Sequence, residues 1–199
     1  MATTVILVRH ASHDRVGTVL CGRMAGVTLG EEGRREARAL ADRFRGETIA
    51  AVISSPLERA KETADIIADR IGVAVEVDEA LNEIDFGAWT GQTFEALGPD
   101  PNWRLWNSSR STTGPPGGEP MSAAQARIVH RIERLRDEYP DGQVILVGHC
   151  DVIRSALAHH LGLSLDRYDR FEISPASVSV LALWPGGSRV MSVNEVVAA

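Results

Sequence analysis

The chain of 199 residues is 44% hydrophobic and 24% charged, a composition that favours one globular domain with a sizeable core and excludes a disordered chain. Its 27 acidic residues outnumber its 21 Lys and Arg residues, so the formal net charge of −6 argues against nucleic acids and anionic membranes as partners. Cys21 and Cys150 have no closely spaced Cys or His partner, which argues against a disulfide framework or a structural metal site.

The first residues of the chain indicate no export or membrane insertion. They contain no basic leader and only four consecutive apolar residues before Arg9, too few for the core of a signal peptide. No apolar run anywhere approaches the roughly 18 residues that a membrane span needs. We therefore expect a cytoplasmic protein.

Short apolar runs alternate with helical patterns along the chain. Three runs of the buried-strand type are Val5–Val8, Ala50–Ile53 and Val144–Val147, and Val73–Val77 predicts a further short strand. Apolar residues recur at helical spacing in Glu32–Arg45, Leu57–Ile71, Ser122–Glu138 and Val152–Leu161. The C-terminal stretch predicts a hairpin of Ser177–Trp184 and Arg189–Val196, turning at Pro185-Gly186-Gly187-Ser188.

Two helix ends carry local signals. Ser55-Pro56 predicts a helix start with Ser55 as the N-cap and proline at the first helical position. Gly162 predicts the end of the last helix, because glycine readily adopts the left-handed conformation that follows a helix.

The strand and helix order predicts an α/β fold. We expect a three-layer sandwich in which a mostly parallel central sheet carries helices on both faces and an antiparallel C-terminal edge. Residues 1–199 should form a single domain. The stretch Gly98–Pro120 is rich in Pro, Gly, Ser and Thr, and it predicts a long loop that inserts into the domain and forms a lid or binding loop.

Cationic and imidazole side chains follow three of the predicted strands. Arg9 and His10 end the first strand, Arg59 lies in the helical turn after the second, and His149 follows the Val144–Val147 strand. Ligands of open α/β sheets bind beyond the carboxyl ends of the strands, so these side chains should meet. Positive groups clustered at helix N-termini are unfavourable unless an anion is bound among them, which predicts a site for a dianion.

Four sequence blocks resemble the histidine phosphatase superfamily, also called the phosphoglycerate mutase-like family, and they occur in the family's order. The blocks are Val8-Arg9-His10; Ser54-Ser55-Pro56-Leu57-Glu58-Arg59-Ala60 with Thr63-Ala64; Asn82-Glu83-Ile84-Asp85-Phe86-Gly87-Ala88-Trp89-Thr90-Gly91; and Val147-Gly148-His149 with Val152-Ile153-Arg154. Together they span most of the chain.

The resemblance implies phosphoryl transfer through histidine without metal or another cofactor. His10 would be the nucleophile that forms a phosphohistidine. Arg9, Arg59 and His149 would surround the phosphate and stabilise the charge on its oxygens. Glu83 would be the acid that protonates the leaving oxygen and later accepts a proton from water, which requires a raised pKa.

The chain departs from the family pattern after the nucleophile. Ala11 and Ser12 stand where the family usually has Gly and then Glu or Gln, and no Asn lies between His10 and Asn82, although the family commonly binds phosphate with an Asn a few residues beyond the nucleophile. His13, Arg15 and Thr18 are the available donors, and we hypothesise that His13 replaces that Asn.

Three further residues occupy positions at which members of the family contact the substrate. Cys21 and Gly22 correspond to a small residue and a glycine whose backbone contacts the substrate, and the side chain of Arg23 is a candidate contact for an acidic group of the substrate.

The predicted function is metal-independent hydrolysis of a small phosphorylated metabolite. Three alternatives remain open at the sequence level: a cofactor-dependent phosphoglycerate mutase, a phosphatase that acts on phosphohistidine proteins, and a non-catalytic phospholigand-binding protein on the same scaffold. The expected partner is a small phosphomonoester, and the sequence leaves the oligomeric state open.

Overall fold

A six-stranded sheet forms the centre of the computed structural model, which describes residues 2–197. Its strand order is β3-β2-β4-β1-β5-β6. The first four of these strands pair in parallel, and β5 and β6 add an antiparallel edge. In chain order the strands are β1 (Thr3–Arg9), β2 (Ala51–Ser54), β3 (Val75–Val77), β4 (Gln143–Gly148), β5 (Ser177–Trp184) and β6 (Gly187–Val196). The predicted mostly parallel sheet with an antiparallel C-terminal edge is confirmed.

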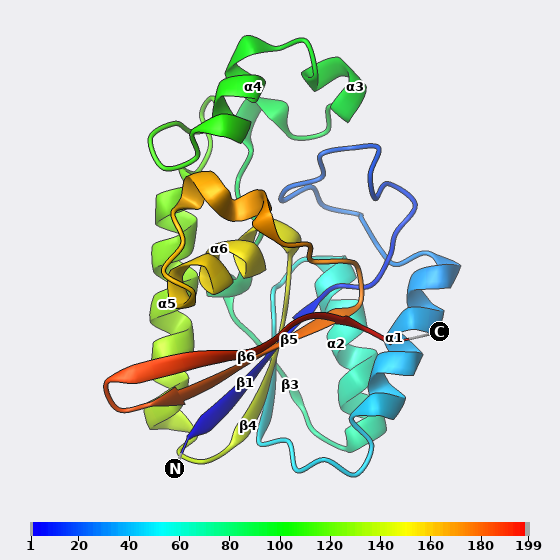
Figure 1. Cartoon of the computed structure of the whole chain (residues 1–199). Coiled ribbons are helices and arrows are strands. Elements are labelled where there is room, and N and C mark those ends of the chain that lie inside the picture. The colour runs from blue at the N-terminus through cyan, green and yellow to red at the C-terminus, as the bar shows by residue number, and fades with distance from the viewer. Residues whose placement is uncertain (1, 198–199) are drawn as a thin grey trace.

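Helices cover both faces of this sheet (Figure 1). The helices α1 (Glu31–Arg43) and α2 (Glu58–Ile71) pack on one face, and α5 (Met121–Glu138) and α6 (Cys150–His160) pack on the other. Alternate residues of a strand point to opposite faces, so Val8 joins the cluster of α1 and α2 and Leu7 joins that of α5 and α6. This explains why the central strands are apolar at successive positions.

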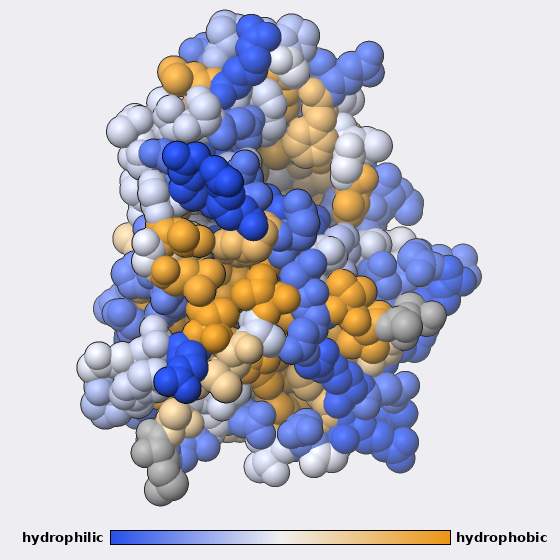
Figure 2. Space-filling view, in the orientation of Figure 1, coloured by the Kyte–Doolittle hydropathy of each residue, from blue (hydrophilic) through white to orange (hydrophobic). Residues whose placement is uncertain are grey.

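The distribution of apolar and hydrophilic side chains on the surface reflects the same layers. In Figure 2, apolar side chains gather over the middle of the molecule, where α6 and the strands lie, and hydrophilic side chains surround them. No helix within residues 2–197 combines the length and the apolar character needed to cross a bilayer. Met1, Ala198 and Ala199, which the single-domain prediction included, lie outside the described residues.

The two predicted helix ends differ in outcome. Gly162 adopts φ +67° just after α6, as predicted. The prediction at Ser55-Pro56 is wrong, because α2 begins at Glu58 and its N-cap residue is Leu57. The Ser55 hydroxyl instead accepts a hydrogen bond from the backbone N–H of Leu57 (3.3 Å) and contacts Nε2 of His149 (2.8 Å), so it closes a turn before the helix.

The prediction that Gly98–Pro120 is entirely a loop is also wrong. It contains α4 (Pro101–Ser108), which follows the short helix α3 (Phe94–Leu97). Asp100 caps α4 by accepting a hydrogen bond from the N–H of Asn102 (2.8 Å). Pro101 lies in the first turn, where the backbone N–H that proline lacks would have no partner within the helix. Trp106 anchors the helix in the core with no exposed surface. Three short 3₁₀ helices, η1 (Glu79–Leu81), η2 (Gly87–Trp89) and η3 (Leu165–Arg170), complete the structure.

Two glycines let the end of the insertion pack directly against the chain that follows Glu83. Gly87 has φ +50°, and a Cβ added to it would lie 2.2 Å from the carbonyl oxygen of Pro116. A Cβ on Gly118 would lie 2.3 Å from the carbonyl oxygen of Asp85. The N–H of Ala88 donates to Pro116 across this contact (3.0 Å). The backbones therefore meet at a distance that only glycine allows.

We predict that Gly87→Ala and Gly118→Ala each lower the free energy of unfolding by about 2 kcal/mol or more, because each added Cβ forces two backbone segments apart. Gly117→Ala is the matched control: Gly117 has φ +68° but no heavy atom within 4 Å of an added Cβ, so it should lose only about 1 kcal/mol. Urea denaturation measures all three. Equal losses in the three variants would contradict the close approach.

Candidate active site

A cavity of about 370 Å³ opens at the carboxyl ends of β1 and β4. Residues from distant parts of the chain line it: the end of β1, the loop of residues 13–22, α2, the stretch after Asn82, the insertion and α6. Seven of the nine predicted site residues line it, and the two that do not are His149 and Arg23.

His10 follows β1 and is 4% exposed. Its Nδ1 lies 2.9 Å from the carbonyl oxygen of Ala11. Because a carbonyl can only accept, Nδ1 carries the proton and Nε2 keeps its lone pair. Burial, followed by the guanidiniums of Arg59 and Arg9, holds the pKa of His10 well below 6.5. The ring is therefore neutral at pH 7, which is the state that a nucleophile needs.

His149 lies opposite His10, with the two ring centroids 5.2 Å apart. It is fully buried at the N-cap position of α6. Its Nε2 contacts the Ser55 hydroxyl (2.8 Å), which in turn donates to Oδ1 of Asn82 (3.3 Å). This chain of hydrogen bonds places the ring proton of the neutral form on Nε2. Nδ1 is buried and has no hydrogen-bond partner among the described residues.

Two arginines complete the inner wall of the cavity. Arg59 is 2% exposed, and its Nη2 donates to the carbonyl oxygen of Gly22 (2.7 Å), whereas Nε and Nη1 have no partner within the described part of the chain. Arg9 donates from Nη1 to the carbonyl oxygen of Ile173 (2.7 Å) and leaves Nε without a partner there. Buried donors normally find acceptors, so this wall is built for an anion with several oxygens.

Glu83 is 8% exposed and lines the same cavity. Its Oε1 accepts a hydrogen bond from the N–H of Ile84 (3.0 Å). Burial, with the charge of Asp151 as the next cause, raises the pKa of Glu83 to about 7. A carboxyl with this pKa can give or accept a proton near neutral pH.

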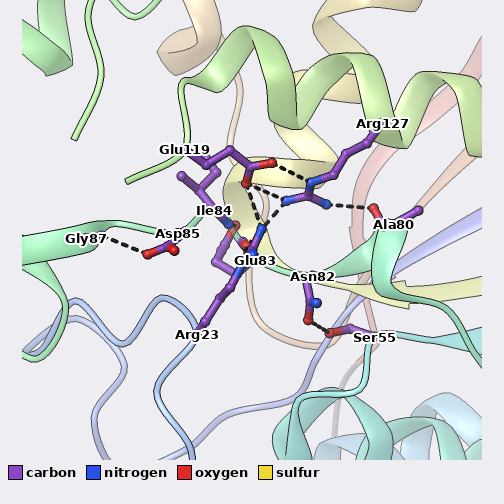
Figure 3. Close-up of polar contacts among 10 residues, drawn as sticks. All are labelled: Arg23, Ser55, Ala80, Asn82, Glu83, Ile84, Asp85, Gly87, Glu119 and Arg127. Carbon is purple, nitrogen blue, oxygen red and sulfur yellow. Dashed lines mark hydrogen bonds and ion pairs between the residues drawn. The ribbon is translucent and has the colours of Figure 1, made fainter. Parts of the chain in front are cut away.

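A brace of charged side chains holds the backbone of Glu83 (Figure 3). The carbonyl oxygen of Glu83 accepts from Nε of Arg23 (2.8 Å) and from Nη2 of Arg127 (3.3 Å), and both arginines form ion pairs with Glu119 (2.9 and 2.8 Å). Arg23 was a predicted substrate contact, but it is not among the described residues that line the cavity. The structure uses it to position Glu83.

The other predicted substrate contacts, His13, Cys21 and Gly22, do line the cavity. The ring of His13 stacks on that of His10 at 5.3 Å. Burial and the charge of Arg59 lower the pKa of His13 to about 4. Its Nδ1 accepts from the N–H of Arg15 (3.3 Å), so the proton of the neutral ring is on Nε2. His13 can therefore donate a hydrogen bond while uncharged, as an Asn side chain does.

The sequence analysis missed Ser55 and Thr63 as supports of the site. Ser55 fixes His149, and the Thr63 hydroxyl accepts from the N–H of Ala11 (3.1 Å), the residue next to His10. It also missed a charged wall made by Asn107, Arg110, Asp151, Arg154 and Tyr168. Two of these residues carried a sequence signal, because Arg154 belongs to the fourth sequence block and Asp151 directly follows His149-Cys150. No group of three or more His, Cys, Asp or Glu in residues 2–197 is arranged to hold a metal ion.

A family model, curated relatives and a solved structure each match this chain over most of its length. The sequence model of the histidine phosphatase superfamily (branch 1) matches residues 5–196. The bifunctional protein Rv2228c of Mycobacterium tuberculosis is 34% identical over 197 residues, which are 97% of this chain but 54% of that protein, so the chain spans about half the length of this relative. Phosphoserine phosphatase 1 of Hydrogenobacter thermophilus is 28% identical over 96% of this chain and 91% of its own. The structure of the mycobacterial glucosyl-3-phosphoglycerate phosphatase Rv2419c superimposes with a TM-score of 0.87 at 28% identity and covers 98% of this chain and 99% of its own.

The raised pKa of Glu83 predicts a specific dependence of stability on pH. Between pH 5 and pH 7 the folded chain keeps a proton on Glu83 that the unfolded chain has released, so the stability that depends on this proton is lost as the pH rises through this window. Glu83→Gln cannot titrate. Its free energy of unfolding, relative to that of the wild type, should increase by about 3 kcal/mol from pH 5 to pH 8.

Chemical denaturation at both pH values measures this difference. All other titratable residues are the same in the two proteins, so the comparison isolates the contribution of Glu83. A difference that does not change with pH would show that Glu83 has an ordinary pKa.

Proposed function

The chain belongs to the histidine phosphatase superfamily, and we propose that it hydrolyses a small phosphomonoester through a phosphohistidine on His10. The fold, which the order of strands and helices predicted, and the family, which the four sequence blocks indicated, are confirmed. The observation that carries the proposal is the pair of buried rings 5.2 Å apart, His10 and His149, enclosed by two guanidiniums with unmet donors. Such a space fits one phosphoryl group.

In the first step, the lone pair on Nε2 of His10 attacks phosphorus while the bond to the leaving oxygen breaks. Glu83 gives its proton to that oxygen and becomes a carboxylate. Arg9 and Arg59 hold the equatorial oxygens and stabilise the charge that spreads over them. Burial, followed by the charge of Arg59, holds the pKa of His149 well below 6.5. The dianion counteracts these positive charges, so Nδ1 of His149 takes up a proton and donates to the same group.

In the second step, water attacks the phosphorus of the phosphohistidine. The carboxylate of Glu83 accepts a proton from the water as the new P–O bond forms. The P–N bond breaks, its electron pair returns to Nε2 of His10, and inorganic phosphate leaves. Glu83 is then protonated again and ready for the next cycle, which a pKa of about 7 permits at neutral pH.

The substrate is proposed to be a small phosphorylated metabolite. The names of two relatives, a phosphoserine phosphatase and a glucosyl-3-phosphoglycerate phosphatase, support this class. The roles of His13, Cys21 and Gly22 in binding it, the independence from metals and the cytoplasmic location all stay predictions. Gly22 contributes through its backbone, since it adopts φ +49° and its carbonyl fixes Arg59.

We predict that His10→Ala lowers the turnover of phosphomonoesters by at least about 1000-fold, because it removes the nucleophile, and that EDTA leaves wild-type turnover unchanged. Phosphate release measures both. Full activity in His10→Ala would contradict the mechanism. Tight phosphate binding without turnover in the wild type would favour a binding protein, and isomerisation of 3-phosphoglycerate with added bisphosphoglycerate would favour the mutase.

We predict that Glu83→Gln lowers turnover according to the leaving group. An alkyl phosphate needs a proton on its poor leaving oxygen and should be hydrolysed about 100-fold more slowly or worse. With an activated aryl phosphate, the rate of the phosphorylation step should fall much less. Single-turnover kinetics on glycerol phosphate and p-nitrophenyl phosphate isolate this step. Equal losses on both substrates would exclude Glu83 as the acid.

We predict that His13→Ala raises KM for phosphomonoesters about tenfold, because the dianion loses one donated hydrogen bond. His13→Asn should restore most of the affinity, since the amide of Asn also donates while uncharged. Steady-state kinetics at pH 7 compare the three proteins. If His13→Ala has unchanged kinetics, another group takes the place of the family's Asn.

A further inference from the structure

One wall of the cavity carries charged side chains that the proposed reaction does not use. Arg110 belongs to the insertion, just after α4, and Asp151 and Arg154 belong to α6. Tyr168 of η3 lies beneath them, with its ring centroid 3.5 Å from the guanidinium carbon of Arg110 and 5.5 Å from that of Arg154. All four line the same cavity as His10.

Within this wall the opposite charges of Arg110 and Asp151 neutralise each other in an ion pair. Nη1 of Arg110 donates to the Asp151 carboxylate (2.9 Å), and the two side chains are only 4% and 15% exposed. Nη2 of Arg110 donates to the hydroxyl of Tyr168 (2.7 Å) and to Oδ1 of Asn107 (3.0 Å). These contacts fix the guanidinium in place. Nε of Arg110 is nevertheless buried and has no hydrogen-bond partner within residues 2–197.

Arg154 is left as the uncompensated cation of the wall. Its side chain is 13% exposed, and its ion-pair partner Glu172 (2.8 Å) has a side chain that is 77% exposed. A pair with such an exposed carboxylate contributes little, because solvent screens it. Nε of Arg154 is also buried without a hydrogen-bond partner in the described part of the chain. The neighbouring Cys150 does not supply a negative charge, since burial raises the pKa of its thiol to about 11.

We propose that Arg154, supported by the fixed Arg110, binds a carboxylate on the substrate, so that the substrate is a phosphomonoester that also carries a carboxylic acid group. This inference rests on the proposed function, because the phosphate must occupy the His10 end of the same cavity. With the solvent-screened Glu172 left out, the charges of Arg110, Asp151 and Arg154 sum to +1, which matches a carboxylate. A second phosphate dianion would exceed that charge and would meet the carboxylate of Asp151. A planar guanidinium also fits the two oxygens of a carboxylate.

Matched substrates test this proposal. O-Phosphoserine and O-phosphoethanolamine differ by a carboxylate, and 3-phosphoglycerate and glycerol 3-phosphate differ by a carboxylate in place of an alcohol. In the wild type, kcat/KM should be about tenfold or more higher for the carboxylate member of each pair, as expected for a charge-assisted hydrogen bond. Arg154→Met should bring the ratio close to one by slowing only the carboxylate members, and Arg154→Lys should keep part of the ratio.

Arg134→Met is the control variant. Arg134 lies on α5 with a side chain that is 61% exposed and pairs with Glu138, so its replacement should leave the ratio unchanged. Equal losses on both members of a pair in Arg154→Met would mean that Arg154 only supports the fold, and would overturn the proposal. A wild-type preference for glycerol 3-phosphate over 3-phosphoglycerate, or for O-phosphoethanolamine over O-phosphoserine, would overturn it as well.

Binding separates this proposal from the proposed function. In His10→Ala, calorimetry with 3-phosphoglycerate and glycerol 3-phosphate needs no turnover. If the wild type hydrolyses none of the four compounds, the proposed function fails. If His10→Ala binds 3-phosphoglycerate more tightly than glycerol 3-phosphate, and the double variant His10→Ala/Arg154→Met does not, the carboxylate site is still supported. Equal binding of the two compounds by His10→Ala would refute it.

Discussion

The burial of several cationic groups around one small space is the constraint on which the rest of this structure depends. Arg59 is almost fully buried, and two of its three nitrogens have no hydrogen-bond partner among the described residues. An unmet buried donor costs about 1–3 kcal/mol, and more when it is charged. The fold tolerates this because His10 and His149 remain neutral. In the proposed reaction, the free donors are satisfied by the dianion of the substrate.

The scaffold keeps that geometry through backbone contacts. His10 and His149 follow β1 and β4, which are paired in parallel, and this pairing sets the two rings side by side. Glu83 lies on irregular chain, and its position depends on the Arg23 and Arg127 brace and on the close approach at Gly87. The acid is thus positioned by a less regular part of the molecule than the nucleophile, which explains why so many side chains converge on its main chain.

The charged wall formed with the insertion has a different origin. Arg110 is buried between Trp106 and Tyr168 and joins the insertion to α6 through Asp151. The inner wall of the cavity comes from the ends of β1 and α2, whereas the charged wall comes from the insertion, α6 and η3.

Periodicity and strand order sufficed to predict the sheet, its covering helices and the meeting of His10, Arg59 and His149, because residues at the carboxyl ends of parallel strands must lie together. The helix α4 could have been predicted from Asp100-Pro101, but the Pro and Gly around it obscured that signal. The brace by Arg23 could not be predicted, since its partner Glu119 is 96 residues away along the chain and no pattern joins them. The start of α2 was misplaced because Ser55 binds His149, a tertiary contact that local capping rules do not include.

A crystal structure of the complex with vanadate tests the central claim most directly, since vanadate adopts the five-coordinate geometry of a phosphoryl group in transfer. The account predicts vanadium bonded to Nε2 of His10, with its oxygens on Nη1 of Arg59, on Arg9 and on Nδ1 of His149. Vanadate bound away from His10, or held while Arg59 and His149 turn to other partners, would contradict it.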